Sequence, residues 1–141
     1  MSIATWKKEF YPTPADQCTA ANALDHSIRL WEGARKSSLK AHGLRKGGRE
    51  GTDLIDDDFN TFFLTARNHC ALCLNYRSCM LDSVPDQETC PIARMIGGTC
   101  FDACDVWHEE DDARPMLTLL KRVKREMAKR AKTKKTNSCK T

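Results

Sequence analysis

Six cysteines lie between His69 and Cys104, and they are the side chains in this chain of 141 residues best suited to chemistry. Cys70 and Cys73 form a C-x2-C pair, which offers two thiolates to one ion from a single tight turn. A chain that stays in a reducing compartment keeps its thiols reduced, so a cluster this dense favours a metal site over disulfides. Disulfide-bonded or plain buried cysteines remain an alternative.

Tetrahedral zinc needs four ligands, so a second pair must come from elsewhere in the chain. Cys90 and Cys100 are the preferred pair, because Pro91 fixes the backbone after the first and Gly97-Gly98 lets the chain fold back before the second. Cys104 follows Cys100 by four residues and would share its face of a helix. The predicted Zn²⁺ ligands are Cys70, Cys73, Cys90 and Cys100, with Cys79, Cys104 and His69 as alternates.

An iron–sulfur cluster is the alternative cofactor. Cys70, Cys73 and Cys79 have the spacing C-x2-C-x5-C, and Cys90 precedes a proline, which resembles the cysteine run of cluster-bearing nucleases and DNA glycosylases. Those families place a further cysteine and a catalytic domain upstream, whereas only Cys18 lies upstream here. Histidines next to cysteines also supply the residue types for thiol catalysis, but metal or structural use is favoured, and no catalytic residue is assigned.

Charge is divided unevenly along the chain. From position 114 onward there are eleven Lys and Arg residues against one acidic residue, a net charge of about +10. Because the whole chain carries +4, residues 1–113 carry about −6. This division indicates an acidic body and a basic arm that meets an anionic partner, or simply keeps the protein soluble. The residues predicted to bind nucleic acid or an acidic partner are Lys121, Arg122, Lys124, Arg125, Lys129 and Arg130.

Apolar spacing predicts several helices. Ala20, Leu24, Ile28 and Trp31 recur at helical intervals, which predicts a helix over 19–34. A short helix should follow and end at Gly43. Further short helices are expected at 90–96 and 101–108. The longest is expected over 113–132, where the apolar stripe consists of Met116, Leu119, Leu120, Val123 and Met127.

The remaining segments are less regular. Residues 45–58 contain three glycines and mixed charges, which predicts a loop. Residues 61–66 form either a short strand or the end of a helix, and 81–89 should be a loop. The aromatic N-terminal segment, with Trp6, Phe10 and Tyr11, is expected to dock on the body rather than stay exposed.

These expectations define a mainly α fold: a small irregular domain built around a cysteine-ligated metal site, with a long basic C-terminal helix. The domain with its aromatic N-terminal segment would span 1–112, the amphipathic basic helix 113–132, and a flexible basic tail 133–141. The N-terminus lacks the pattern of a signal peptide and no stretch is apolar enough to span a membrane, so the cytoplasm is the expected location.

Short blocks of the first hundred residues resemble a group of small cysteine-rich proteins of unassigned activity encoded by tailed bacteriophages. These blocks are 6–12 (WKKEFYP), the helix around His26, 40–44 (KAHGL), 70–73 (CALC) and Cys90-Pro91. The resemblance implies a non-virion protein that acts inside the bacterial host cell, where many such proteins bind and redirect a host component. It implies no site residues.

The sequence is therefore consistent with three hypotheses about function. The first is a non-enzymatic zinc-binding interaction protein, encoded by a phage, that binds and modulates a host protein such as a defence or nucleic-acid-processing factor. The second is a regulatory protein that binds DNA or RNA non-specifically through its basic helix. The third is an iron–sulfur protein associated with nucleic-acid processing.

Overall fold

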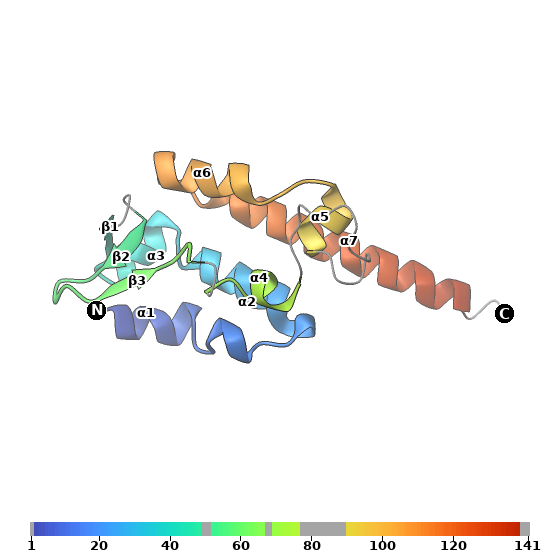
Figure 1. The fold of residues 1–141 in the computed structure, drawn as a ribbon, viewed down its shortest axis with the longest axis horizontal. Helices are drawn as coiled ribbons and strands as arrows, with labels where there is room; N and C mark the ends of the chain where they lie inside the picture. The colour runs from blue at the N-terminus through green and yellow to red at the C-terminus, as the bar shows by residue number, and fades with distance from the viewer. Residues whose placement is uncertain (1, 49–51, 67–68, 77–89, 139–141) are drawn as a thin grey trace.

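The computed structural model describes residues 2–48, 52–66, 69–76 and 90–138, which form a mainly helical chain with one small sheet (Figure 1). The prediction of a mainly α fold is confirmed. In chain order the elements are α1 (Ile3–Phe10), η1 (Ala15–Gln17), α2 (Ala20–Glu32), α3 (Lys36–Ala41), β1 (Arg45–Gly47), β2 (Asp53–Ile55), β3 (Thr61–Phe63), α4 (Ala71–Asn75), α5 (Pro91–Ile96), α6 (Phe101–Glu110) and α7 (Arg114–Ser138).

Helix α2 lies at the centre of the fold and packs against α1, α4 and α7. Its buried side chains include Leu24, Leu30 and Trp31, at the spacing of one helical face. Helix α7, which packs on α2, contributes Leu120 and Val123 to the core, and these side chains are 1% and 0% exposed. Full burial of an aliphatic side chain contributes about 1.5–3 kcal/mol, so this shared face is a main source of stability. It also sets the distance between the elements that carry the cysteines.

The N-terminal aromatic segment docks on the body, as predicted, and it does so as helix α1. Ser2 starts the helix with a capping box, in which its Oγ accepts from the Thr5 backbone N–H at 3.2 Å. Trp6 is fully buried, and its Nε1 donates to the Gly33 carbonyl at 2.9 Å. A β-carbon on Gly33 would lie 2.6 Å from the Phe10 ring, so α1 approaches α2 this closely only because residue 33 is glycine.

The prediction of a loop over residues 45–58 is wrong. Strands β1 and β2 lie in this segment and pair antiparallel, with Lys46 opposite Leu54, and β3 extends the sheet by placing Phe62 opposite Leu54. Leu54 is fully buried and Phe62 nearly so, which explains why these short strands form despite the surrounding glycines. The alternative of strand or helix end at 61–66 is resolved as a strand.

A rigid turn joins β2 to β3, and Asp56 organises it. The Asp56 carboxylate accepts from the backbone N–H groups of Asp58 at 3.0 Å and Asn60 at 2.9 Å, and from that of Ile3 at 3.0 Å. The Ile3 bond is the main cause that lowers the pKa of Asp56. The turn holds Phe59 in the left-handed region at φ 63°, with 77% of the side chain exposed.

Replacing Phe59 with Asn should leave the melting temperature unchanged or raise it by up to about 3 °C. The left-handed backbone disfavours a non-glycine residue by about 1–2 kcal/mol, and Asn tolerates it better. The ring gains little in return, because its main contact is the Arg45 guanidinium 5.5 Å from its centroid, an interaction of about 0.5–1 kcal/mol. Thermal unfolding of the Phe59→Asn variant, compared with that of the Phe62→Ala variant, tests this prediction. A loss by Phe59→Asn as large as that of buried Phe62→Ala would contradict it.

Helices α5, α6 and α7 start close to the positions that the sequence predicts. Helix α5 ends at Gly97, which adopts φ 76° as its C-cap, and α6 covers the predicted 101–108 segment. Helix α7 starts after Asp112, whose Oδ1 accepts from the Arg114 backbone N–H at 3.0 Å. Hydrogen bonds from the Arg114 side chain and then its backbone lower the pKa of Asp112 to about 2. The helix continues to Ser138, beyond the end predicted near 132.

Candidate metal centre

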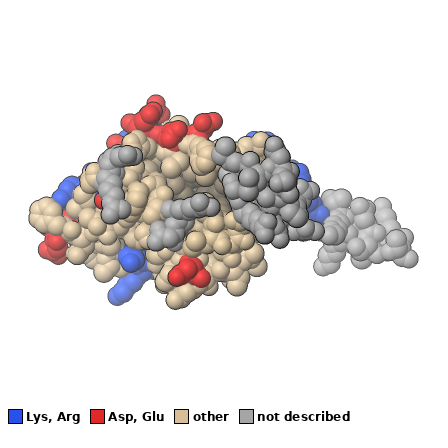
Figure 2. Space-filling view, in the orientation of Figure 1, with Lys and Arg blue, Asp and Glu red and all other residues tan. Residues whose placement is uncertain are grey.

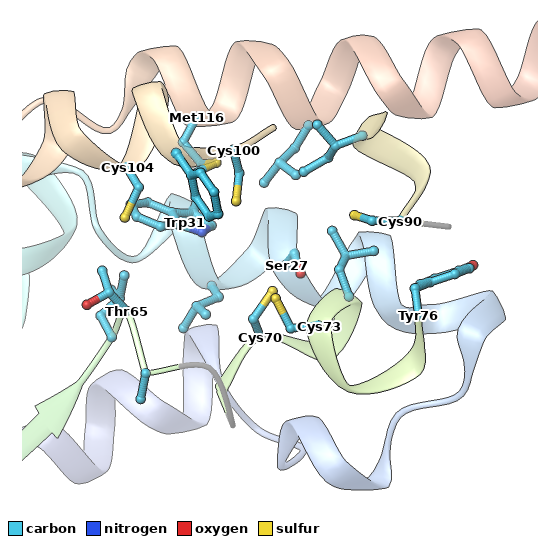
Figure 3. Close-up of a pocket in the computed structure, with 17 residues that line it drawn as sticks. Ser27, Trp31, Thr65, Cys70, Cys73, Tyr76, Cys90, Cys100, Cys104 and Met116 are labelled. Carbon is cyan, nitrogen blue, oxygen red and sulfur yellow. The ribbon is translucent and has the colours of Figure 1, made fainter. Parts of the chain in front are cut away.

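Five cysteines line one cavity of about 340 Å³ between α2, α4, α5, α6 and α7. In Figure 3 the sulfurs of Cys70 and Cys73 lie together at α4, Cys90 points inward from the start of α5, and Cys100 points inward from the start of α6. Cys104 lies one turn farther along α6. All four predicted zinc ligands therefore belong to this cavity, together with the alternate Cys104.

Three of these cysteines occupy equivalent positions in their elements. Cys70, Cys90 and Cys100 are the N-cap residues of α4, α5 and α6. The backbone N–H groups at the start of a helix have no partner within the helix, so they favour a thiolate nearby. The folding of each of these helices thus places one sulfur at the cavity.

The C-x2-C pair interacts directly. A hydrogen bond with the Cys73 side chain lowers the pKa of Cys70, burial opposes this, and the backbone N–H groups of Cys73 and Leu72 support it. For Cys73, the bond to Cys70 and then burial raise the pKa, and negative charge on Cys70, Cys100 and Cys90 adds to the effect. The pair thus holds one negative charge more readily than two, and a bound dication would relieve that repulsion.

The rest of the described cavity wall is mostly apolar, with Ser27, Thr65 and Tyr76 as its hydroxyl-bearing residues. Leu30, Trp31, Leu72 and Met116 face the space, and so does Ser27, which is 2% exposed. No described group completes a hydrogen bond with Ser27 Oγ, although the hydroxyl is near enough to Cys70 to help lower its pKa. Sequence reasoning missed Ser27, although a serine inside an apolar helical stripe is a recognisable signal.

The described side chains of the cavity are not arranged around one centre. Among the residues that the structure describes, no group of three or more His, Cys, Asp or Glu side chains is arranged to hold a metal. None of the six described cysteines forms a disulfide, so that alternative is not seen in this part of the chain. Zinc binding would require these sulfurs to move closer together around a common centre.

The alternate ligands differ in position. His69 is absent from the cavity wall: its Nδ1 lies 2.6 Å from the Phe63 carbonyl oxygen, and its ring stacks on Phe62 at 4.3 Å. Cys79, which the iron–sulfur alternative needs, lies outside the described residues, as does the predicted loop at 81–89. Cys18 lies elsewhere, with its sulfur 3.8 Å from the Pro14 carbonyl oxygen.

The basic residues of α7 fall into two groups. Lys121 pairs with Glu32 at 2.8 Å and Lys124 with Asp25 at 2.7 Å, so both contact α2. The hydrogen bond from Lys121 is the main cause that lowers the pKa of Glu32. Arg130 lies 3.5 Å from Glu126 within α7. The described ion pairs do not include the other three predicted residues, which share one exposed face at i, i+3 and i+7: Arg122, Arg125 and Lys129.

Acidic side chains gather elsewhere on the surface. Figure 2 shows them along the edge formed by α6, where Asp102, Asp105, Glu109 and Glu110 are exposed. Because α6 packs on α7, the acidic and basic surfaces belong to neighbouring helices. The charge division seen in the sequence is therefore also a division between two helices.

No family model matches this chain, and neither a curated protein nor a solved structure shows significant similarity to it. None of the described helices combines the length and the apolar character that a bilayer-spanning segment requires.

Proposed function

We propose that this chain is a non-enzymatic zinc-binding interaction protein, in which Cys70, Cys73, Cys90 and Cys100 hold one ion. The observation that carries the proposal is the shared cavity, because residues up to thirty positions apart bring their sulfurs to one space. Four thiolates are a ligand set that tetrahedral zinc prefers. With zinc bound, α4, α5 and α6 would be fixed relative to one another by the metal as well as by packing.

The proposed zinc has a structural role for two reasons. A set of four thiolates leaves no open coordination position for a substrate, whereas catalytic zinc keeps one. Beyond the thiols, the described part of the cavity wall offers few polar groups, and Ser27 is the buried one among them. A general acid or base beside the metal is therefore not part of the proposal.

The interaction role rests on the turn between β2 and β3. Phe59 is held in a disfavoured backbone conformation with most of its ring exposed, so neither local geometry nor burial explains an aromatic residue there. Rigid, exposed aromatic side chains are typical anchors of protein interfaces. Asp57 and Asp58 are exposed beside it, so the partner surface would combine an apolar pocket with basic side chains.

The resemblance to small phage proteins gives the proposed setting. The chain would act in the cytoplasm of a bacterial host cell and bind a host protein, and a defence factor or a nucleic-acid-processing factor is the proposed class of target. Its effect would be to modulate that partner rather than to catalyse a reaction.

Elemental analysis of the protein purified from bacterial cells tests the metal part of this proposal. The expected result is about one zinc per chain, with little iron. A brown protein that contains iron and acid-labile sulfide would favour the iron–sulfur alternative instead. Protein free of both metals, with full thermal stability, would contradict the proposal.

Capture from bacterial lysate tests the interaction part. Wild-type protein should retain a host protein at high salt, and Phe59→Asn, which should fold equally well, should retain much less of it. If both proteins retained the host protein equally, the turn between β2 and β3 would not be part of the binding interface.

Nucleic-acid binding is a second candidate function, favoured by the exposed face of α7 that carries Arg122, Arg125 and Lys129. Three phosphate contacts would give a salt dependence with a slope of about −2.7 on a double-logarithmic plot. Replacing these three residues with Gln should abolish such binding, whereas Lys121→Gln with Lys124→Gln should affect it less. The second pair is the control, because its side chains contact α2.

A further inference from the structure

Ser27 interrupts the buried face of α2. The neighbouring positions on that face are all buried and carry aliphatic or aromatic side chains, none of which can accept a hydrogen bond: Ala23, Leu24, Leu30 and Trp31. Helix α2 packs on α4 here, so the Ser27 hydroxyl is directed to the element that carries the C-x2-C pair. A helix that needed only packing at this position would be served better by alanine.

The Ser27 hydroxyl is buried beside the cysteine sulfurs without a completed hydrogen bond. It is 2% exposed, and no described group completes a hydrogen bond with Oγ. It faces the cavity near the sulfur atoms of Cys70 and Cys73 (Figure 3). A neutral thiol is a weak acceptor, whereas a thiolate bound to a metal is charged and accepts strongly.

We propose that Ser27 is a positioning residue for Cys70: when zinc is bound, its Oγ–H donates a hydrogen bond to the Cys70 thiolate and orients that sulfur toward the ion. This inference rests on the proposed zinc site. Groups that hold metal ligands in place in this way usually contribute about 10–100-fold to metal affinity. Without zinc the same hydroxyl contributes less, because no described group completes a hydrogen bond with it and a neutral thiol accepts only weakly.

The inference predicts opposite effects of one substitution on two measurements. Ser27→Ala should weaken zinc binding about tenfold in competition with a chromophoric chelator. The melting temperature of the metal-free protein should be unchanged or higher, because the buried hydroxyl is gone. Ser27→Thr, which keeps the hydroxyl, should retain most of the zinc affinity.

Ser38→Ala is the matched control. The Ser38 hydroxyl donates to the Glu32 carbonyl at 2.7 Å and is not part of the cavity wall. Its loss should lower the melting temperature of the metal-free protein and leave zinc affinity unchanged. Ser27→Ala should therefore change mainly the zinc affinity, and Ser38→Ala mainly the melting temperature of the metal-free protein.

A spectroscopic measurement separates hydrogen bonding from packing. In the cobalt-substituted protein, a hydrogen bond to sulfur stabilises the sulfur lone pairs, so Ser27→Ala should shift the sulfur-to-cobalt charge-transfer band to lower energy, and Ser27→Thr should not. Unchanged zinc affinity in Ser27→Ala would overturn the role of Ser27 while leaving the zinc site intact. Equal losses of affinity and of metal-free stability would also overturn it. Failure of the wild-type protein to bind zinc would overturn both proposals.

Discussion

Replacing Cys70 and Cys73 together with Ser should remove zinc from the protein and lower its melting temperature by at least about 10 °C. We take the loss in the free energy of unfolding as about 5 kcal/mol, which is well below the full binding energy of structural zinc. A loss of this size lowers the melting temperature of a domain of this length by about 15 °C. The short helices explain the large effect. Helices α4 and α5 contain five and six residues, too few to be stable without tertiary support.

The control for this prediction is Cys18→Ser. Cys18 lies outside the cavity, and its sulfur makes only a long contact with the Pro14 carbonyl oxygen at 3.8 Å. Its replacement should change the melting temperature by less than about 3 °C and leave the zinc content intact. Differential scanning calorimetry with metal analysis of the same samples makes the comparison. A stable double variant, or zinc retained by it, would contradict the structural role of the pair.

Trp107→Ala should destabilise the protein by about 3–5 kcal/mol, the range for removal of a buried aromatic side chain. Trp107 is fully buried, and its ring meets that of Trp31 edge to face at 5.5 Å. Its Nε1 donates to the Ala34 carbonyl at 3.3 Å, and Lys46 Nζ lies 4.1 Å from the ring centroid. One side chain thus connects α6 to α2 and to the sheet.

Denaturant unfolding measures this effect. Phe59→Ala is the matched control, since it removes an aromatic ring that is 77% exposed and should change the free energy of unfolding by less than about 1 kcal/mol, the upper limit for its contact with Arg45. If the two variants lost equal stability, the core around Trp107 would not be organised as described. Trp107 does not line the cysteine cavity, so zinc content should survive at temperatures where the variant is folded.

The sequence predicted those elements whose residues repeat with a clear period. The apolar stripes of α2 and α7 placed α2 and the start of α7 within about two residues, since burial on one face requires that spacing, but not the end of α7. No comparable pattern marks α1 or strands of three residues such as β1. These form because Trp6 and Leu54 find buried places that other segments create.

The candidate site was predictable in part. Cysteine spacing indicated which sulfurs would share one region, because thiols have few structural uses at such density. Spacing named Cys104 only as an alternate ligand, and it did not indicate that Lys121 and Lys124 would contact acids of α2. Those facts depend on how helices rotate against each other, which the packing of the whole chain decides.

X-ray absorption at the zinc edge, recorded on the purified protein, would identify the ligands of the proposed ion. We expect four sulfur neighbours at about 2.3 Å and no nitrogen or oxygen neighbour. The Cys104→Ser variant should give the same spectrum, and Cys100→Ser should lose one sulfur or the metal itself. A first shell with nitrogen or oxygen in the wild-type protein, or no bound zinc to measure, would contradict a centre built from Cys70, Cys73, Cys90 and Cys100.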